Sequence, residues 1–106
     1  PVEEAIALIH AAGGVAALAH PVRVRDYAAR LGPWVDAGLD GLEVYYPDHT
    51  PVFTRDARGN ARRYGLIMTG GSDFHGAGTD GAITLGSQRV PPACVEQILA
   101  RAARYR

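Results

Sequence analysis

The chain has 106 residues, of which 47% are hydrophobic and 21% charged, and its eleven basic and eleven acidic residues give a formal net charge of zero at pH 7. This composition is typical of a globular protein with one small core, and it argues against a disordered or fibrous chain. Because charges of both signs are scattered along the sequence, no broad surface for duplex nucleic acid is predicted.

The single cysteine and the lengths of the apolar runs indicate the cellular compartment in which the protein is expected to function. Cys94 is the only cysteine, which excludes an internal disulfide and favours a reducing, cytoplasmic setting with a buried structural thiol. No apolar run approaches the ~20 residues that span a bilayer, and the acidic start with Glu3 and Glu4 lacks the order of a signal peptide. Since a helical pattern begins directly at Pro1, we expect the chain to start inside a longer protein.

Helical and strand patterns alternate along the chain. Apolar residues at spacings of three and four indicate helices, and short continuous apolar runs indicate strands buried on both faces. Pro33 is expected to kink the second helix or to split it in two. The predicted helices cover residues 2–12, 26–37, 51–64 and about 91–103, and the predicted strands cover residues 15–19, 42–45, 66–69 and 83–85.

The short connections predict an α/β fold of parallel strands, joined by right-handed crossovers with the helices outside. Three or four strands are too few to close a barrel, and a bare parallel sheet is rare because its edges stay open. The chain is therefore either a small open sheet or part of a barrel whose other strands lie outside it. We favour the second interpretation.

Polar side chains accompany three successive predicted strands. His20 follows the first strand, Glu43 lies in the second, and Asp73 and His75 follow the third. The carboxyl ends of parallel strands meet at one edge, where loops carry ligand-binding groups. His20 and Asp73 would be about two strand spacings of ~4.8 Å apart, a span that neighbouring metal ions ~3.5–4 Å apart bridge.

Asp73-Phe74-His75 places a carboxylate and an imidazole two residues apart, so that in extended backbone both point to one side. A mixed set of this kind favours a catalytic transition metal such as zinc, manganese or iron. The pattern alone is common by chance, and His20 alone equally fits a residue that caps the turn before Pro21. From the residues by themselves, both interpretations stay open.

Three segments in this order carry a resemblance to a known family: Ala19-His20-Pro21, Gly41-Leu42-Glu43-Val44-Tyr45 and Gly71-Ser72-Asp73-Phe74-His75-Gly76. Together they resemble the later motifs of the polymerase-and-histidinol-phosphatase (PHP) family of metal-dependent phosphoesterases. A fourth segment, Tyr45-Tyr46-Pro47-Asp48-His49, is similar to the bacterial nucleotide-phosphoesterase branch, which includes 3′,5′-bisphosphonucleotide phosphatases and 5′–3′ exoribonucleases.

The resemblance implies a distorted seven-stranded (β/α) barrel with two or three divalent metal ions at its carboxyl rim, manganese first and zinc or iron as alternatives. It implies that His20, Asp73 and His75 are catalytic residues and metal ligands, and that residues 1–106 form the C-terminal part of a single PHP domain. The family's opening His-X-His, its early aspartate and its further ligands have no counterpart here. The chain by itself is therefore expected to bind metal weakly.

Four more residues are candidates for substrate binding, each with an alternative role. Arg23 either grips phosphate with its two-pronged guanidinium or is solvated. Glu43 either orients a ligand or reaches substrate, or it is a strand-end carboxylate that pairs with a nearby arginine. His49 either contacts phosphate or donates to a leaving oxygen, or is an ordinary loop histidine. Ser72 either presents its hydroxyl to phosphate or caps a turn.

Three other side chains are assigned to structure. His10 falls on the polar side of the first predicted helix and is expected to be solvent-exposed, whereas Trp34 and Tyr64 are expected to pack in the core.

The function that the resemblance implies is hydrolysis of phosphoester bonds in nucleotides or short single-stranded RNA by the intact protein. One alternative is a phosphatase for another small molecule, such as histidinol phosphate. The other is a non-catalytic PHP accessory module, for example one attached to a polymerase.

Overall fold

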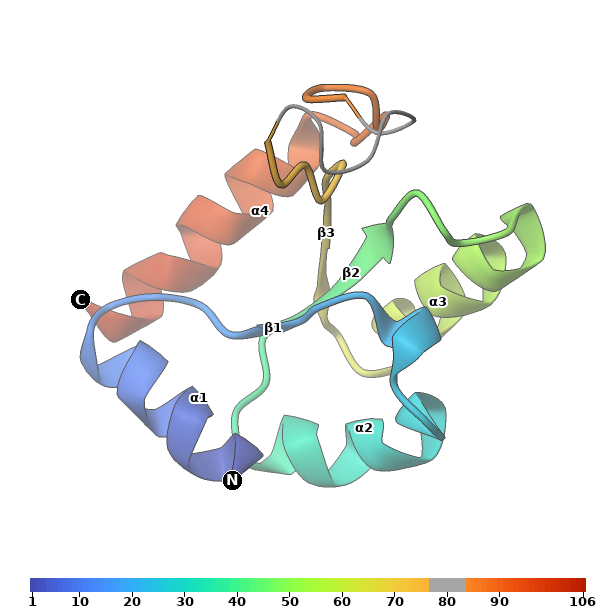
Figure 1. Ribbon diagram of the computed structural model, residues 1–106. Coiled ribbons are helices and arrows are strands. Elements are labelled where there is room, and N and C mark those ends of the chain that lie inside the picture. Colours follow the sequence, from blue (N-terminus) through green and yellow to red (C-terminus); the bar gives the residue numbers. More distant parts are fainter. Residues whose placement is uncertain (77–83) are drawn as a thin grey trace.

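A computed structural model describes residues 1–76 and 84–106, where helices alternate with the strands of one sheet (Figure 1). The segments that follow the strands Ala17–Leu18 and Ile67–Gly70 include the short 3₁₀ helix Pro21–Arg23 and the irregular residues 71–76. A second 3₁₀ helix, Ala103–Tyr105, follows the last α-helix. The elements are α1 (Val2–Ala11), β1 (Ala17–Leu18), α2 (Tyr27–Asp36), β2 (Gly41–Tyr45), α3 (Pro51–Arg63), β3 (Ile67–Gly70) and α4 (Ala93–Ala102).

The three strands are parallel and lie in the order β1-β2-β3. Leu42 in β2 pairs with Leu18 on one side and Met68 on the other, so the carboxyl ends of all three strands lie at the same edge. This confirms the predicted α/β fold with parallel strands. Closure into a barrel stays a prediction, because in the described residues β1 and β3 each pair with one neighbour.

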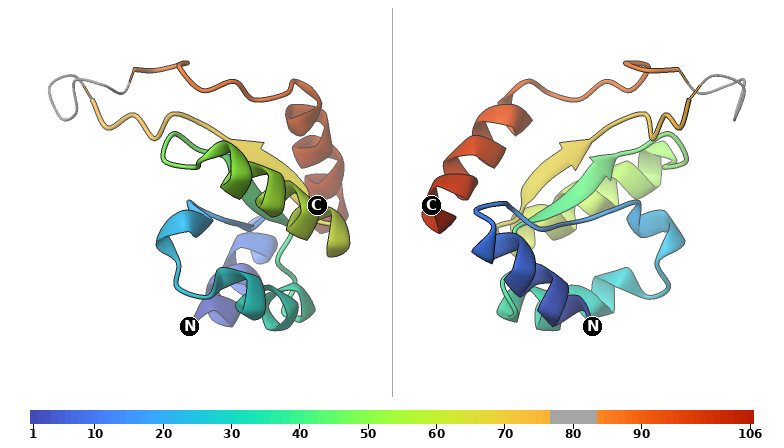
Figure 2. Two further views of the ribbon diagram at one scale, coloured as in Figure 1. Left: turned by 90° about the vertical axis from the view of Figure 1, so that its right-hand side faces the viewer. Right: turned by 60° about the vertical axis from the view of Figure 1, so that its left-hand side comes forward.

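Helices flank the sheet. Figures 1 and 2 show α1 and α2 together near the amino terminus, and α3 and α4 on either side of β3. The amino end of α3 is capped by Thr50, whose hydroxyl accepts a hydrogen bond from the Phe53 N–H at 3.1 Å, and Pro51 occupies the first turn. No helix in the described part of the chain is long and apolar enough to cross a bilayer.

Pro33 does not split α2, so that alternative of the prediction is wrong. The helix is assigned as one element from Tyr27 to Asp36 with Pro33 inside it. Proline costs one backbone hydrogen bond, and the buried side chains of Tyr27 and Leu31 hold the helix on the core in spite of that loss.

The core lies between the sheet and the first three helices. Leu42 and Val44 of β2 and Leu31 of α2 are completely buried, and Ala57 and Ala61 give α3 a small-residue side that packs closely on the strands. Trp34 and Tyr64 pack against this core, and Cys94 is buried, as the sequence predicts.

Two predicted strands differ from those observed. In the first, only Ala17 and Leu18 pair as a strand, while the Ala16 carbonyl accepts hydrogen bonds from the N–H groups of Asp40 and Gly41. In the last, residue 83 lies outside the described residues, and residues 84 and 85 are not in a strand. Leu85 is 79% exposed, so its side chain is not packed against the described part of the core.

His10 corrects another expectation, because it faces inward. Its Nε2 lies 2.7 Å from Oδ2 of Asp40, a carboxylate that is only 1% exposed at the start of β2. The Ala16 N–H donates to the same oxygen at 2.8 Å, and the Tyr105 hydroxyl and the Arg101 guanidinium donate to Oδ1. The hydrogen bond to this buried acid therefore holds His10 on the inward side of α1, not on the solvent side.

These four side chains, His10, Asp40, Arg101 and Tyr105, are called the Asp40 cluster below. It joins α1, α4 and the final 3₁₀ helix to Asp40, which directly precedes β2 at the amino end of the sheet. Burial pushes the pKa of Asp40 upward, but the hydrogen bonds from Tyr105, the Ala16 N–H and His10 outweigh it, so the pKa is lowered overall.

Candidate functional site

His20 stands directly beyond β1 in an unusual backbone conformation. Its φ is 29° and its ψ is 65°, a left-handed region that few residues other than glycine adopt. Its backbone N–H donates to Oε1 of Glu43 at 2.8 Å, so a side chain from β2 holds the turn. Within the described residues, its ring nitrogen Nδ1 is buried and has no hydrogen-bond partner. An unpaired buried nitrogen of this kind is suited to a ligand.

Asp73 and His75 contact each other beyond β3. His75 Nδ1 donates to the Asp73 carbonyl at 2.6 Å, which leaves Nε2, 3.7 Å from Oδ1 of Asp73, as the ring nitrogen available to a ligand. The side chain of His75 is 68% exposed. The prediction of extended backbone is wrong here, because Asp73 has a φ of 57° and the irregular segment itself brings carboxylate and imidazole together.

Tyr46, which the sequence interpretation did not assign to the site, lies between these groups. It is 3% exposed, and its hydroxyl donates to Oδ2 of Asp73 at 2.8 Å. Its ring centroid lies 5.7 Å from that of His20, and the guanidinium of Arg23 lies 5.4 Å from it on the ring face. Burial and the hydrogen bond to Asp73 raise the pKa of Tyr46 to about 12, so the hydroxyl stays a donor. The sequence signal that could have assigned Tyr46 to the site is its position directly after β2, at the carboxyl rim.

Arg23 is engaged with an acid at the surface. Its guanidinium donates to Oδ2 of Asp48 at 2.7 Å, and both side chains are more than half exposed. The hydrogen bond to Asp48, followed by the field of Tyr46, raises the pKa of Arg23. An arginine held in this way is charged and oriented, and an anion would compete with a screened surface pair.

His49 and Ser72 are less accessible than Arg23. His49 Nδ1 donates to the Val44 carbonyl at 2.7 Å, so the neutral ring carries its lone pair on Nε2, which is buried and has no partner in the described residues. Its ring packs on Phe53 with centroids 4.5 Å apart. Ser72 is also buried. Contact of either side chain with a substrate therefore requires neighbouring side chains to move.

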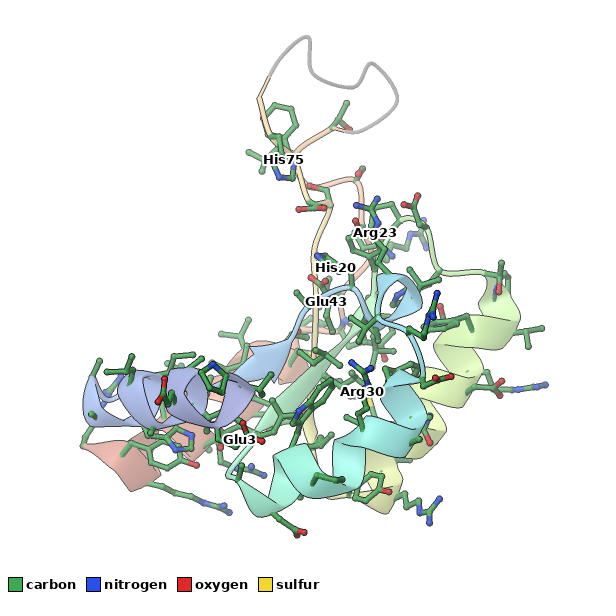
Figure 3. The ribbon with its side chains drawn as sticks, turned by 60° about the horizontal axis from the view of Figure 1, so that its bottom comes forward. Glu3, His20, Arg23, Arg30, Glu43 and His75 are labelled. Atoms are coloured by element: carbon green, nitrogen blue, oxygen red, sulfur yellow. The ribbon has the colours of Figure 1, made fainter. Side chains whose placement is uncertain are left out.

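The structure brings some, but not all, of the residues predicted at the carboxyl rim close to one another. Figure 3 shows His20, Glu43 and Arg23 close together, with His75 further out on the segment after β3. Across residues 1–76 and 84–106, no group of three or more His, Cys, Asp and Glu side chains is placed to hold a metal ion. The unpaired Nδ1 of His20 and the Asp73–His75 pair nevertheless fit part of a mixed imidazole and carboxylate site whose other ligands come from elsewhere.

Comparison with protein-family models finds no match. Among curated proteins, the chain is 41% identical over 73 residues to the phosphoribosyl 1,2-cyclic phosphate 1,2-diphosphodiesterase of Eggerthella lenta, covering 69% of the chain and 28% of that protein. It is 35% identical over 96 residues to the 3′,5′-nucleoside bisphosphate phosphatase of Chromobacterium violaceum, covering 87% of the chain and 34% of that protein.

Two solved structures share the fold. One is described as a metal-dependent phosphoesterase from Bifidobacterium adolescentis, with a TM-score of 0.76 and 37% identity over 94% of the chain and 36% of that structure. The other is described as an amidohydrolase from Chromobacterium violaceum with bound sulfate and no metal, with a TM-score of 0.76 and 31% identity over 94% of the chain and 37% of that structure.

The chain thus spans about a third of the length of the curated relatives that it matches. Both relatives, and one of the two solved structures, are named for the hydrolysis of phosphoester bonds.

Proposed function

We propose that the protein containing this chain is a metal-dependent phosphoesterase of the PHP type that hydrolyses small phosphorylated substrates. The observation that carries the proposal is that Tyr46, at the carboxyl rim of parallel strands, contacts both His20 with its ring and Asp73 with its hydroxyl. Both residues hold left-handed backbone at this rim. Strain of this kind is found preferentially at functional sites.

In this proposal His20 contributes Nδ1, Asp73 a carboxylate oxygen and His75 Nε2 as ligands to divalent metal ions, with the remaining ligands supplied from outside the chain. Manganese is the first candidate, and zinc and iron also suit imidazole with carboxylate. When bound, such ions lower the pKa of a water molecule to ~7 and offset the charge that builds on the phosphoryl oxygens.

The chain's other residues would bind and orient. Glu43 holds the His20 backbone through its 2.8 Å hydrogen bond and so supports the turn that carries the imidazole. Arg23 would exchange Asp48 for a substrate phosphate, whose geometry suits a bidentate guanidinium. Ser72 and His49 would join the substrate only after the side chains that bury them move aside.

The relatives give two substrates to test first. A 3′,5′-bisphosphonucleotide is favoured by the phosphatase that aligns with 87% of the chain, and a cyclic ribose phosphate by the diphosphodiesterase with 41% identity. Short 5′-phosphorylated RNA tests the proposed 5′–3′ exoribonuclease activity, and histidinol phosphate tests the small-molecule alternative.

The test uses the full-length protein with Mn²⁺ and these four substrates. Replacing both Asp73 and His75 by alanine should lower kcat/KM by at least about 100-fold, because ligands and the groups that orient them are worth that much. Asp56→Ala is the matched control, since Asp56 is an exposed acid on α3 that pairs only with its neighbour Arg55 in the described contacts. Unchanged activity in the double variant would refute the proposal.

Calorimetry with Mn²⁺ separates the enzyme from the non-catalytic alternative. An intact protein that takes up Mn²⁺ but loses this uptake in the double variant supports the hydrolase. An intact protein that takes up no metal supports the accessory module.

A further inference from the structure

Tyr46 joins groups from all three strand ends. It follows β2, its ring packs against His20 beyond β1, and its hydroxyl reaches Asp73 beyond β3. At 3% exposure, the ring is fixed by its surroundings. Packing around the ring therefore limits the positions that the hydroxyl can take.

The Asp73 side chain needs support from Tyr46, because the irregular segment that carries Asp73 does little to hold it in place. Residues 71–76 have no regular secondary structure, and Asp73 itself has a φ of 57°. The Tyr46 hydroxyl donates to Oδ2 at 2.8 Å, while Oδ1 lies 3.7 Å from Nε2 of His75. One carboxylate oxygen is thus held by the core, and the other is directed to the neighbouring imidazole.

This division of the two oxygens is the arrangement that orients a carboxylate ligand. Groups that hydrogen-bond a ligating carboxylate fix its direction and tune its affinity, and their loss typically costs 10–100-fold in metal affinity or activity. The same Tyr46 ring lies beside His20, and the two ring centroids are 5.7 Å apart.

We propose that Tyr46 is a positioning residue that aims Oδ1 of Asp73 at the metal while its own hydroxyl stays bound to Oδ2. This inference rests on the proposed function, since it assigns a role at the same site. Tyr46 acts through Asp73 and does not itself touch the reacting atoms.

Tyr45 provides a matched control for the variant Tyr46→Phe. It is the preceding residue, at the end of β2, and is partly buried, and among the described residues its hydroxyl contacts the sulfur of Met68 at 4.0 Å. Tyr45→Phe and Tyr46→Phe remove the same atom from neighbouring positions, so a difference between them reports the hydrogen bond to Asp73.

In the full-length protein, Tyr46→Phe should weaken Mn²⁺ binding about 10-fold by calorimetry, whereas Tyr45→Phe should bind Mn²⁺ as the parent does. The activity of Tyr46→Phe should fall at limiting Mn²⁺ and recover toward the parent's kcat at high Mn²⁺, with KM for substrate unchanged. A merely structural role would lower the melting temperature without changing the Mn²⁺ dependence.

A double-variant cycle tests whether Tyr46 acts through Asp73. Once Asp73 is alanine, adding Tyr46→Phe should change Mn²⁺ affinity no further, because the group that it positions is gone. An equal 10-fold loss in both backgrounds would overturn the inference.

The outcomes separate this inference from the function that it rests on. Parent-like Mn²⁺ affinity in Tyr46→Phe, together with loss of activity in Asp73→Ala, overturns the positioning role and leaves the phosphoesterase intact. Parent-like activity in Asp73→Ala overturns the phosphoesterase itself. A Tyr46→Phe protein that fails to fold while Tyr45→Phe folds would assign the hydroxyl to the core and also overturn the positioning role.

Discussion

His20, Asp26 and Asp73 are the residues other than glycine that hold positive φ in the described part of the chain. Such conformations cost of order 1–3 kcal/mol each and persist only where the surroundings impose them. Two of the three are proposed metal ligands, and each is tied to a neighbouring strand end by a hydrogen bond, to Glu43 for His20 and to Tyr46 for Asp73.

If His20 is strained for function, glycine should relieve the strain that alanine retains. We expect His20→Gly to be more stable than His20→Ala by about 1 kcal/mol, measured by urea unfolding, while both variants lose Mn²⁺ affinity. The same pair of substitutions at Asp26 should show the same difference in stability with Mn²⁺ affinity retained. Equal stability of the glycine and alanine variants at position 20 would contradict a strained backbone there.

At this scale the sequence predicted which residues would stand at the rim but not how they are held. His20, Asp73 and His75 were found because each follows an apolar strand, and the positions of the strands could be read from local pattern. The hydrogen bond from the His20 N–H to Glu43 and the contacts of Tyr46 join residues more than twenty positions apart. Such contacts depend on the packed sheet, and no local pattern encodes them.

At the scale of elements, the pairing of β2 with β3 sets the position of the segment that carries Asp73. The register shifts between Glu43 and Tyr45, and Gly70 pairs with Tyr45 at the last position of β3. A Cβ on Gly70 would lie 2.5 Å from Cβ of Tyr45, 2.7 Å from its carbonyl oxygen and 2.9 Å from Val90. Only glycine allows the strands and the returning chain to approach so closely.

Gly70→Ala should therefore separate β3 from β2 and destabilise the protein by about 1–3 kcal/mol. It should also weaken Mn²⁺ binding, since Asp73 is three residues further along the chain. Gly59→Ala is the opposite case, because nothing lies within 4 Å of a Cβ there and the residue is inside α3. It should raise stability by about 0.5–1 kcal/mol. Urea unfolding of both variants checks the pair, and an unchanged Gly70→Ala protein would contradict the close approach.

The elements themselves were largely predictable from hydrophobic period and glycine placement. The helix predicted over residues 51–64 is observed as Pro51–Arg63, and the strand predicted over 42–45 as Gly41–Tyr45. The misses have tertiary causes. His10 turns inward because Asp40, thirty residues away, offers a buried acceptor, and the apolar run 15–19 pairs as a strand only at Ala17 and Leu18, where β2 lies alongside.

Over the whole molecule, the Asp40 cluster joins the two ends of the chain. His10 from α1, Arg101 from α4 and Tyr105 from the last turn all converge on one carboxylate, and His10 stacks on Tyr105 with ring centroids 3.8 Å apart. Removing a buried charge that serves several partners leaves each of them unpaired.

Asp40→Asn should destabilise the protein at pH 7 by about 3 kcal/mol. The pKa of Asp40 is lowered in the folded state, so the unfolded chain binds the proton more tightly and stability rises with pH between the two values. The parent should therefore lose this stability as pH falls below the ordinary aspartate value of ~3.9, and Asp40→Asn should lose much less over that window.

Urea unfolding at a series of pH values checks this expectation. Asp56→Asn, which removes an exposed acid on α3, should keep the parent's acid dependence. The same acid dependence in Asp40→Asn as in the parent would show that other carboxylates govern it.

The two ends of the sheet thus differ in role. The Asp40 cluster lies at the amino end, and the candidate ligands follow the strands at the carboxyl end. Laboratory evolution can exploit this separation. Libraries confined to the neighbourhood of His10 and Tyr105 should yield heat-tolerant proteins whose substrate preference is untouched, and libraries confined to the opposite rim should change preference at little cost in heat tolerance.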